Sequence, residues 1–542
     1  MTHPGLPEFW AVIIWFFMIA LSLWAIFQGS SNKIASETLS SKHFSLAHIK
    51  SLQPIVKFIS TSAWPLLILK IISVAFFALV IYAGLNGTPI PERNIATVLT
   101  WNIWWAGLII SIFFVGSAWC AICPWDALAT WFVKPRLWLN NKQLFSINNS
   151  LELTPPKWLR SVFPALLMFI GLTWLELGVG VTTNPYWTAL LSLLMVVLAT
   201  LSLALYKNKA FCHYICPVGR TVGFYAQLAP IELRPINTEI CKNCTTLECF
   251  NGTEKIDACP TQLVMGTLNQ NTYCTSCGNC TQSCPEENIS WRLRPQSNEA
   301  VESARPHWDE AWFMLTLLAL TSFHGITMLE FWEGLISKFA QTLGDSGQLL
   351  TSFSAGFAIS ILIPILLYTL AISLTRNLTR TKVKFKKLFT GLVFITLPLA
   401  FAYHLAHNLN HMIRESVGAS QLFLNPLGID TKPADISANI LKEYNMLISQ
   451  DVLFAMQAFL MMFGFWIAIK VLRHRAVKLL PKSISGSISG SIQGSIPGAG
   501  WKLSPILAFI IGINGFHIWM LTQPMIMRMG SLCVSPNLIA PL

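Results

Sequence analysis

The sequence predicts an all-α polytopic membrane protein, and its composition, its long apolar segments and the distribution of its charges support this fold class. Of the 542 residues, 53% are hydrophobic and only 11% are charged, whereas a soluble domain carries about 25% charged residues. The mean hydropathy is +0.54. This composition excludes an ordinary soluble enzyme and a disordered chain.

Ten apolar segments of about 20 residues are each long enough to cross a hydrocarbon core about 30 Å thick. The first has no basic residues before it and is longer than the core of a signal peptide, so we interpret it as an uncleaved anchor. The ten segments lie near 9–27, 63–84, 96–118, 161–179, 187–206, 311–331, 349–374, 388–408, 451–471 and 504–524.

Lysine and arginine are concentrated in alternate loops. The loops after the first, third, seventh and ninth segments each carry at least four basic residues, whereas 85–95, 180–186 and 332–348 carry at most one each. The positive-inside rule then predicts a bacterial inner-membrane protein with both termini periplasmic and residues 207–310 in the cytoplasm. The net charge of +12 is explained by this topology, and we expect no nucleic-acid partner.

Eight of the thirteen cysteines lie in the short segment 241–284. The second half of this segment has the spacing C-x2-C-x2-C-x3-C-P, and the first half repeats it with longer intervals. In two-cluster ferredoxins the fourth cysteine of each run binds the other cluster. We therefore predict an inserted ferredoxin-like α+β domain with two 4Fe-4S clusters, one held by Cys241, Cys244, Cys249 and Cys284, the other by Cys274, Cys277, Cys280 and Cys259.

Zinc binding and disulfide formation are the alternatives for these eight cysteines. A cytoplasmic location disfavours disulfides, and zinc sites rarely use a doubled run of this spacing.

Four more cysteines lie in two Cys-Pro motifs just after the third and fifth apolar segments. Cys120 and Cys123 belong to WCAICPW, and Cys212 and Cys216 belong to FCHYICPVGR. Four thiolates at one depth can hold iron, a small iron–sulfur cluster or zinc. The alternatives are thiols that only pack and a redox-active dithiol. The remaining Cys533 stands alone, and we assign it no role.

These motifs, followed by the ferredoxin pattern, resemble the NosR/NapH-type membrane polyferredoxins, a family of 4Fe-4S membrane proteins related to CcoG. The resemblance covers roughly residues 96–300 and includes PWDAL after Cys123 and PVGR after Cys216. It implies electron transfer linked to the quinone pool, which supplies a periplasmic reductase or a metal-handling step. This chain differs in a first motif that is one residue shorter, in the lack of a flavin domain before the first segment, and in five further segments after the ferredoxin pattern.

Five histidines lie in the sixth, eighth and tenth segments, in the half expected to face the periplasm. They are His324, His404, His407, His411 and His517. The spacing of the middle three places them on one helix face, and ionisable groups inside membrane segments are usually functional. Three interpretations stay open: axial ligands of a b-type haem, a copper or iron site, or neutral histidines that hydrogen-bond between helices. His3 lies in a loop, and we assign it no role.

The sequence thus predicts five regions. They are a five-helix membrane domain (1–206), the ferredoxin-like domain (207–310), helices six to nine with the histidines (311–482), a Ser/Gly-rich linker (483–503), and the last helix with an outer tail (504–542). The hypothesis is an oxidoreductase subunit that carries electrons between a cytoplasmic donor or the quinol pool and a periplasmic partner protein, with no acid–base catalytic residue. The alternative is a factor for copper or iron transport, reduction or cofactor maturation that uses the ferredoxin as reductant.

Overall fold

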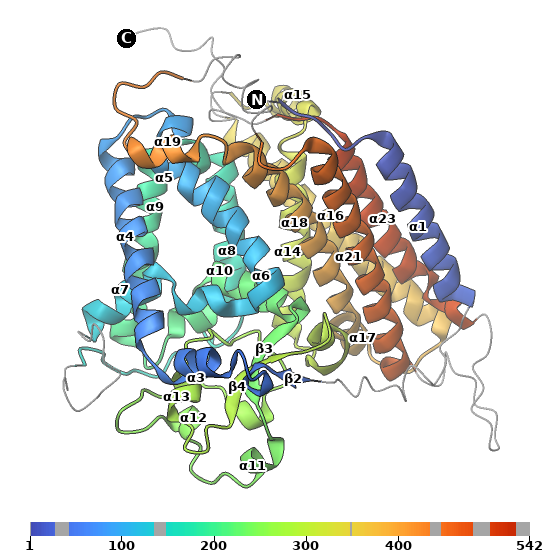
Figure 1. Cartoon of the computed structure of the whole chain (residues 1–542). Coiled ribbons are helices and arrows are strands. Elements are labelled where there is room, and N and C mark those ends of the chain that lie inside the picture. The colour runs from blue at the N-terminus through green and yellow to red at the C-terminus, as the bar shows by residue number, and fades with distance from the viewer. Residues whose placement is uncertain are drawn as a thin grey trace, which may run out of the picture.

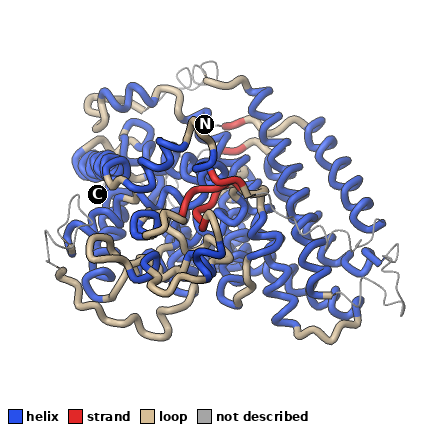
Figure 2. The backbone as a smooth tube through the Cα atoms, turned by 60° about the horizontal axis from the view of Figure 1, so that its bottom comes forward, coloured by secondary structure: helices blue, strands red, loops and turns tan. Residues whose placement is uncertain are grey.

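The computed structural model describes residues 2–27, 43–134, 148–346, 349–433, 446–480 and 499–526. The predictions for most of the Ser/Gly-rich linker and for Cys533 lie outside these residues. Helices dominate the described chain (Figure 1), and strands form only a small part of it (Figure 2). The predicted all-α polytopic fold class is confirmed.

In the described part of the chain, eight helical stretches are long and apolar enough to cross a membrane. They are α1 (Glu8–Phe27), α4 (Trp64–Asn86), the stretch Ile95–Val133, α9 (Pro185–Leu205), α16 (Leu350–Thr379), the stretch Phe385–Glu415, α21 (Gln450–Leu479) and Gly500–Thr522. The stretch Ile95–Val133 contains α5 (Ile95–Thr97), a π-helical turn (Val98–Trp104), α6 (Trp105–Val115), the 3-10 segment η4 (Gly116–Ala121) and α7 (Pro124–Val133). The stretch Phe385–Glu415 contains α17 (Phe385–Leu392) and α18 (Thr396–Glu415), and the last stretch contains α23 (Ser504–Thr522).

The two remaining predicted segments are also helical. One is α8 (Phe163–Gly178), which has only 16 residues. The other is α14 (Trp308–Ile326), which begins with two acidic residues in its first turn and packs against α8, α16 and α18. It ends five residues before the predicted boundary of 331, and a separate helix, α15 (Glu330–Leu343), follows it.

The first helix packs with the last helices and not with its sequence neighbours. Helix α1 contacts α21 and α23, and α4 contacts α7 and α9 (Figure 1). Trp24 of α1 lies under the guanidinium of Arg473, whose Cζ is 4.2 Å from the ring centroid. Asn514 Nδ2 lies 3.2 Å from Met18 Sδ. Helix α1 is therefore in contact with helices from the far end of the sequence.

A small domain lies at one end of the helices and carries the cysteine-rich segment (Figure 1). Its elements are β3 (Ile231–Pro235), α11 (Thr238–Lys242), α12 (Glu248–Asn251), α13 (Asn279–Ser283) and β4 (Ile289–Leu293). Strands β3 and β4 are antiparallel, with Leu233 opposite Trp291. A third strand, β2 (Phe44–Ser45), pairs with β4, and α3 (Gln53–Thr61) packs beside it. Residues after α1 thus complete this domain, which the sequence had not indicated.

The chain ends that the structure describes lie at the opposite end of the helices. Strand β1 (Thr2–His3) pairs with β5 (Met525–Ile526), and the short helix α19 (Ala419–Leu424) lies at the same end (Figure 1). The helices therefore separate the cysteine-rich domain from β1 and β5.

Candidate iron–sulfur centres

Cys120, Cys123, Cys212 and Cys216, here called the membrane-edge set, lie where α6 and α9 end. Cys120 is in η4, and Cys212 is in a π-helical turn, Phe211–Ile215. Each Cys-Pro motif starts a helix because proline suits the first helical position, so Cys123 precedes α7 and Cys216 precedes α10 (Pro217–Tyr225). The backbone N–H of Gly219 donates to Cys216 Sγ at 3.2 Å. Helix N-termini of this kind favour thiolates.

The fold brings the four thiols of the membrane-edge set together. Cys216 interacts electrostatically with Cys120, Cys123 and Cys212, and Cys123 interacts with both Cys120 and Cys212. The two motifs are about 90 residues apart in the sequence. The contacts between α7 and α9 place them side by side.

An ion pair borders the membrane-edge set. Lys209 Nζ donates to Asp126 Oδ2 at 2.6 Å, and Asp126 Oδ1 lies 3.8 Å from Cys212 Sγ. Lys209 also interacts electrostatically with Cys212 and with Cys277 of the small domain. Lys209 is therefore close enough to interact electrostatically with a thiol of the membrane-edge set and with a thiol of the small domain.

The structure also groups the eight cysteines of the small domain. Cys249 interacts electrostatically with the other members of the first predicted set, Cys241, Cys244 and Cys284. Cys280 interacts with the other members of the second set, Cys274, Cys277 and Cys259, and with Cys249 of the first. The two groups therefore adjoin each other.

Several N–H groups point at these sulfur atoms. Asn288 Nδ2 donates to Cys241 Sγ at 3.4 Å, and the backbone N–H of Leu263 donates to Cys259 Sγ at 3.3 Å. Burial raises the pKa of the Cys274 thiol to about 11, so a bound metal would be needed to hold this group as a thiolate near neutral pH. Such N–H···S contacts are one means by which proteins set the potentials of iron–sulfur clusters.

The second set of the small domain lies directly against the membrane-edge set. Ser117 Oγ and Ser276 Oγ are 3.0 Å apart, and Cys120 interacts electrostatically with Cys274. The guanidinium of Arg220 bridges the two regions because it donates to the carbonyl oxygens of Cys212 and Thr272, at 3.0 Å each.

Next to this junction, His213 stacks on Tyr214 with ring centroids 4.0 Å apart. Burial and, to a smaller extent, the charge of Arg220 lower the pKa of His213 to about 3, so it is neutral near pH 7.

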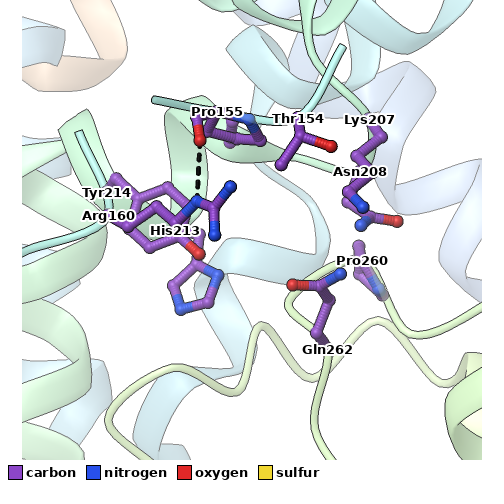
Figure 3. Close-up of a pocket in the computed structure, with 10 residues that line it drawn as sticks. Thr154, Pro155, Arg160, Lys207, Asn208, His213, Tyr214, Pro260 and Gln262 are labelled. Atoms are coloured by element: carbon purple, nitrogen blue, oxygen red, sulfur yellow. Dashed lines mark hydrogen bonds between the residues drawn. The ribbon is translucent and has the colours of Figure 1, made fainter. Parts of the chain in front are cut away.

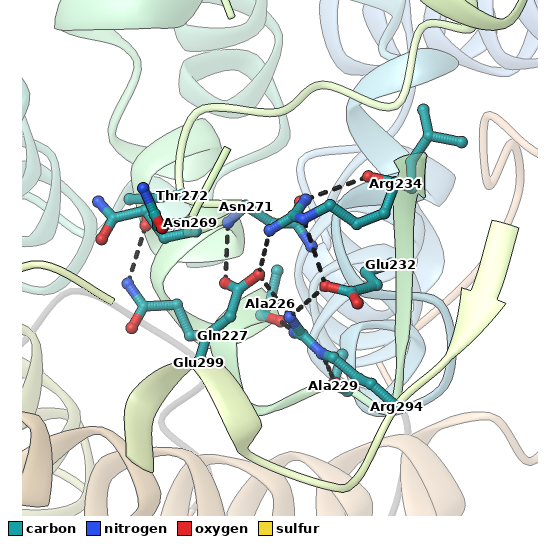
Figure 4. A network of polar contacts seen from close by, with 12 residues as sticks. Ala226, Gln227, Ala229, Glu232, Arg234, Asn269, Asn271, Thr272, Arg294 and Glu299 are labelled. Carbon is teal, nitrogen blue, oxygen red and sulfur yellow. Dashed lines mark hydrogen bonds and ion pairs between the residues drawn. The ribbon is translucent and has the colours of Figure 1, made fainter. Parts of the chain in front are cut away.

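A buried network of charged groups holds the loop that precedes Cys274 (Figure 4). Glu299 accepts hydrogen bonds from Arg234 Nη2 and from the backbone N–H of Asn271, both at 2.8 Å. Arg294 Nη1 donates to Glu232 Oε2 at 2.9 Å. Because every member contacts at least one other, the network fixes this loop against β3 and β4.

The charges in this network control the ionisation of Glu232. Burial by itself would raise the pKa of Glu232, but Arg234, Arg294 and Arg292 together hold it below its usual value. Glu232 is therefore ionised near neutral pH.

The described thiols are available as ligands of a metal or a cluster. All twelve described cysteines are free of disulfides. No three His, Cys, Asp or Glu side chains among the described residues are placed so as to hold one metal ion. In a 4Fe-4S cluster each cysteine binds a different iron, so the sulfur atoms surround the cluster without converging on one point.

The histidines form a column at the opposite end of the helices, and it includes a residue to which the sequence assigned no role. His407 Nε2 and His411 Nε2 are 3.0 Å apart. The rings of His324 and His407, and those of His411 and His3, each have centroids 5.4 Å apart. His3 also lies 3.3 Å from Glu415 Oε1. The pairing of β1 with β5 brings His3 here, and no local sequence signal could have shown it.

The other two predicted histidines make different contacts. His404 Nδ1 lies 3.2 Å from the hydroxyl of Tyr225. His517 Nε2 lies 2.8 Å from Ser322 Oγ, and its ring stacks on Tyr403 with a centroid distance of 4.3 Å. We therefore call His324, His407, His411 and His3 the histidine column and treat His404 and His517 as its neighbours.

Sequence reasoning also missed Asp126, Lys209, Arg234 and Glu299, because their importance depends on partners far away in the chain. Arg220 and Asp126 belong to the quoted motifs PVGR and PWDAL. Those motifs were the signal that could have pointed to both residues.

Residues 97–145 and 188–229 match a protein family described as a "4Fe-4S binding domain". These two stretches contain all four cysteines of the membrane-edge set. The fold and this match indicate an iron–sulfur protein with helices long and apolar enough to span a membrane.

Two individual proteins are similar to parts of the chain. The "Putative electron transport protein YccM" of Escherichia coli (strain K12) is 28% identical over 130 residues, which cover 23% of this chain and 32% of YccM. The match thus spans about a third of YccM. An uncharacterized protein of Methanocaldococcus jannaschii is 23% identical over 194 residues, which cover 34% of this chain and 75% of that protein. No solved structure matches the chain.

Proposed function

We propose that this protein carries electrons one at a time along three iron–sulfur centres, from its cysteine-rich domain to the membrane-edge set, and onward across the membrane to a periplasmic acceptor. The observation that carries the proposal is the direct contact of the second cysteine set with the membrane-edge set through Arg220 and the Ser117–Ser276 pair. Bound 4Fe-4S clusters accept and release single electrons, and the protein positions them and sets their potentials.

The proposed ligands of the first cluster are Cys241, Cys244, Cys249 and Cys284, and those of the second are Cys274, Cys277, Cys280 and Cys259. The electrostatic neighbours within each group support this division. For the membrane-edge set we propose a third 4Fe-4S cluster. The support is the match of both of its motifs to the 4Fe-4S family.

The proposed location, orientation and partners of the protein are based on its resemblance to NosR/NapH-type polyferredoxins and on the charge of its loops. We propose a bacterial inner-membrane protein with the cysteine-rich domain in the cytoplasm and the termini in the periplasm. Its partners would be a cytoplasmic reductant or the quinone pool on one side and a periplasmic redox protein on the other. The chain would then act as a subunit of an oxidoreductase.

Iron analysis tests the number of centres. We expect about twelve iron atoms per chain from three 4Fe-4S clusters, whereas a content below about eight would overturn even the pair in the small domain. The double variant Cys120→Ser/Cys212→Ser should lose about four iron atoms and should no longer pass electrons from the small domain to an acceptor at the far side of a proteoliposome. Cys533→Ser is the matched control and should keep both properties. Unchanged electron flow in the double variant would exclude the membrane-edge set from the path.

A second candidate function is reduction or transport of copper or iron at the adjacent pair His407 and His411 of the histidine column, whose Nε2 atoms are 3.0 Å apart. The specific observation in its favour is that the buried Nδ1 atoms of His3, His407 and His411 have no hydrogen-bond partner in the described structure. Imidazole nitrogens of this kind can bind copper, iron or haem iron. The visible spectrum discriminates between these metals: Soret and α bands that sharpen on reduction indicate haem, and their absence favours copper or iron. A preparation without copper, iron or haem beyond the iron–sulfur content would overturn this candidate.

A further inference from the structure

Two adjoining cavities lie where the membrane-spanning helices meet the cysteine-rich domain. Their volumes are about 350 Å³ and about 450 Å³. Both cavities are lined by Lys207 and Asn208, which follow α9 in the sequence, and by Pro260 of the cysteine-rich domain. The first cavity is lined by no cysteine, whereas the second is also lined by Cys277, a proposed ligand of the second cluster.

The first cavity is lined by hydrogen-bond donors and by no carboxylate. Figure 3 shows Arg160 and His213 on one side, with Lys207, Asn208 and Gln262 on the other. The Nε of Arg160 donates to the carbonyl of Pro155 at 2.7 Å, which holds the guanidinium at the cavity. No ion pair joins Arg160 or Lys207 to a described carboxylate. A guanidinium and an ammonium group beside two amides form a set suited to the oxygens of a phosphate.

The backbone around the first cavity is held in an unusual conformation. Asn208 has φ of 61° and Gln262 has φ of 58°, and both therefore lie in the left-handed region. Residues other than glycine rarely adopt this conformation because it costs free energy. They keep it only where contacts with the surrounding structure hold the backbone in place. The N–H of Lys209 donates to the carbonyl of Pro260 at 3.1 Å, and this bond joins the two segments.

The second cavity combines basic side chains with an apolar wall. Lys70, Lys134 and Lys209 line it together with Lys207, opposed by Glu152 and Asp257. The apolar wall comes from three membrane-spanning elements, α4, α7 and α9, through residues that include Leu66, Leu67, Trp131 and Leu203. Basic groups and an apolar wall at the end of membrane helices suit a molecule with a charged head and an apolar tail.

We propose that these two cavities form a binding site for a phosphate-bearing ligand, with Arg160 and Lys207 as its main contacts. Two sources of phosphate share this chemistry: the headgroup of an anionic phospholipid and free inorganic phosphate. The apolar wall from α4, α7 and α9 favours the lipid. Arg160 and Lys207 are not proposed cluster ligands, so their replacement tests this site without removing a ligand, although Cys277 of the second cluster lines the second cavity.

Calorimetric titration of the purified full-length protein tests this site with three probes. These probes are dihexanoyl phosphatidylglycerol, inorganic phosphate and dihexanoylglycerol, which lacks phosphate. In the double variant Arg160→Ala/Lys207→Ala, we expect the dissociation constant for phosphatidylglycerol to rise about 30-fold, because each basic group contributes about 1 kcal/mol. The matched control Lys382→Ala/Lys384→Ala removes the same charge from another basic loop and should leave this constant unchanged.

The outcomes separate the sources and can overturn the proposal. Tight binding of phosphatidylglycerol with weak binding of phosphate assigns the site to the lipid, and equally tight binding of phosphate assigns it to the free ion. Equal affinities in wild type and the double variant, or equally tight binding of dihexanoylglycerol, would overturn the site. The single variant Arg160→Lys should give an intermediate constant because it keeps the charge but loses the planar fork. An unchanged iron content in each variant shows that the protein has kept its fold.

Discussion

Glu232 is a buried carboxylate whose charge is balanced by the guanidinium groups of Arg292, Arg294 and Arg234. Arg292 Nε and Arg294 Nη1 approach it at 2.7 and 2.9 Å. Because the pKa of Glu232 is lowered in the folded protein, its ionised form stabilises the fold at pH values above the ordinary glutamate pKa. That contribution is lost as the pH falls through the lowered folded-state value.

Replacement of this carboxylate tests the network. Glu232→Gln should lower the free energy of unfolding near pH 7 by about 3 kcal/mol, because it leaves buried guanidinium groups without their counter-charge. It should also lose less stability than the wild type as the pH falls below about 4.5. Thermal unfolding measured across this pH range checks both expectations. The control Glu239→Gln removes an exposed carboxylate paired with Lys242 and should have almost no effect; an equal loss in both variants would contradict the role given to Glu232.

Single residues also show where prediction from sequence stops. The cysteine spacings predicted two groups whose members are neighbours in the structure. Such neighbours are predictable because spacing within one short segment carries the information. His3 is not predictable in this way, since its contacts with His411 and Glu415 depend on residues more than 400 positions away.

Helix α10 is the element that joins the membrane-edge set to the cysteine-rich domain. It starts after Cys216 and carries both Arg220 and Gly223. A Cβ atom at Gly223 would lie only 2.0 Å from the carbonyl oxygen of Thr272. Glycine is therefore required here because the helix backbone lies against the loop that leads to Cys274.

A methyl group at this position should push the two parts apart. Gly223→Ala should cost about 1–3 kcal/mol through overpacking, and the iron bound by the second set should fall because Cys274 moves with the loop. Gly107→Ala is the matched control, since a Cβ there meets nothing within 4 Å. Thermal unfolding and iron content of the two variants check this expectation, and indistinguishable results would refute the close contact of α10.

At the scale of the whole molecule, the helices separate a cysteine-rich end from a histidine-rich end. Strands β3 and β4 lie at the first end, and β1 and β5 lie at the second (Figure 1). The basic loop with Lys382 and Lys384 connects α16 to α17, and α17 lies at the same end of the helices as β3 and β4 (Figure 1). The charge of this loop predicts that the cysteine-rich end faces the cytoplasm.

Reporter insertions test this orientation. Alkaline phosphatase is active only after export, so insertion after Asp345 should give an active reporter. Insertion after Lys382 should give less than about a tenth of that activity, because the basic loop stays in the cytoplasm. Immunoblots of each insertion provide the control for protein amount. The reverse pattern would place the cysteine-rich domain in the periplasm.

The amino-acid sequence was sufficient to predict helices that can span a membrane, their approximate positions and the grouping of the cysteines into motifs. These properties are encoded locally, in runs of about 20 apolar residues and in short fixed spacings. Three features could be seen only in the folded chain: the packing of α1 with α21 and α23, the pairing of β2 with the small domain, and the place of His3 in the histidine column. Each of these depends on contacts between segments far apart in the chain, whose free energies come from packing and burial that no local pattern records.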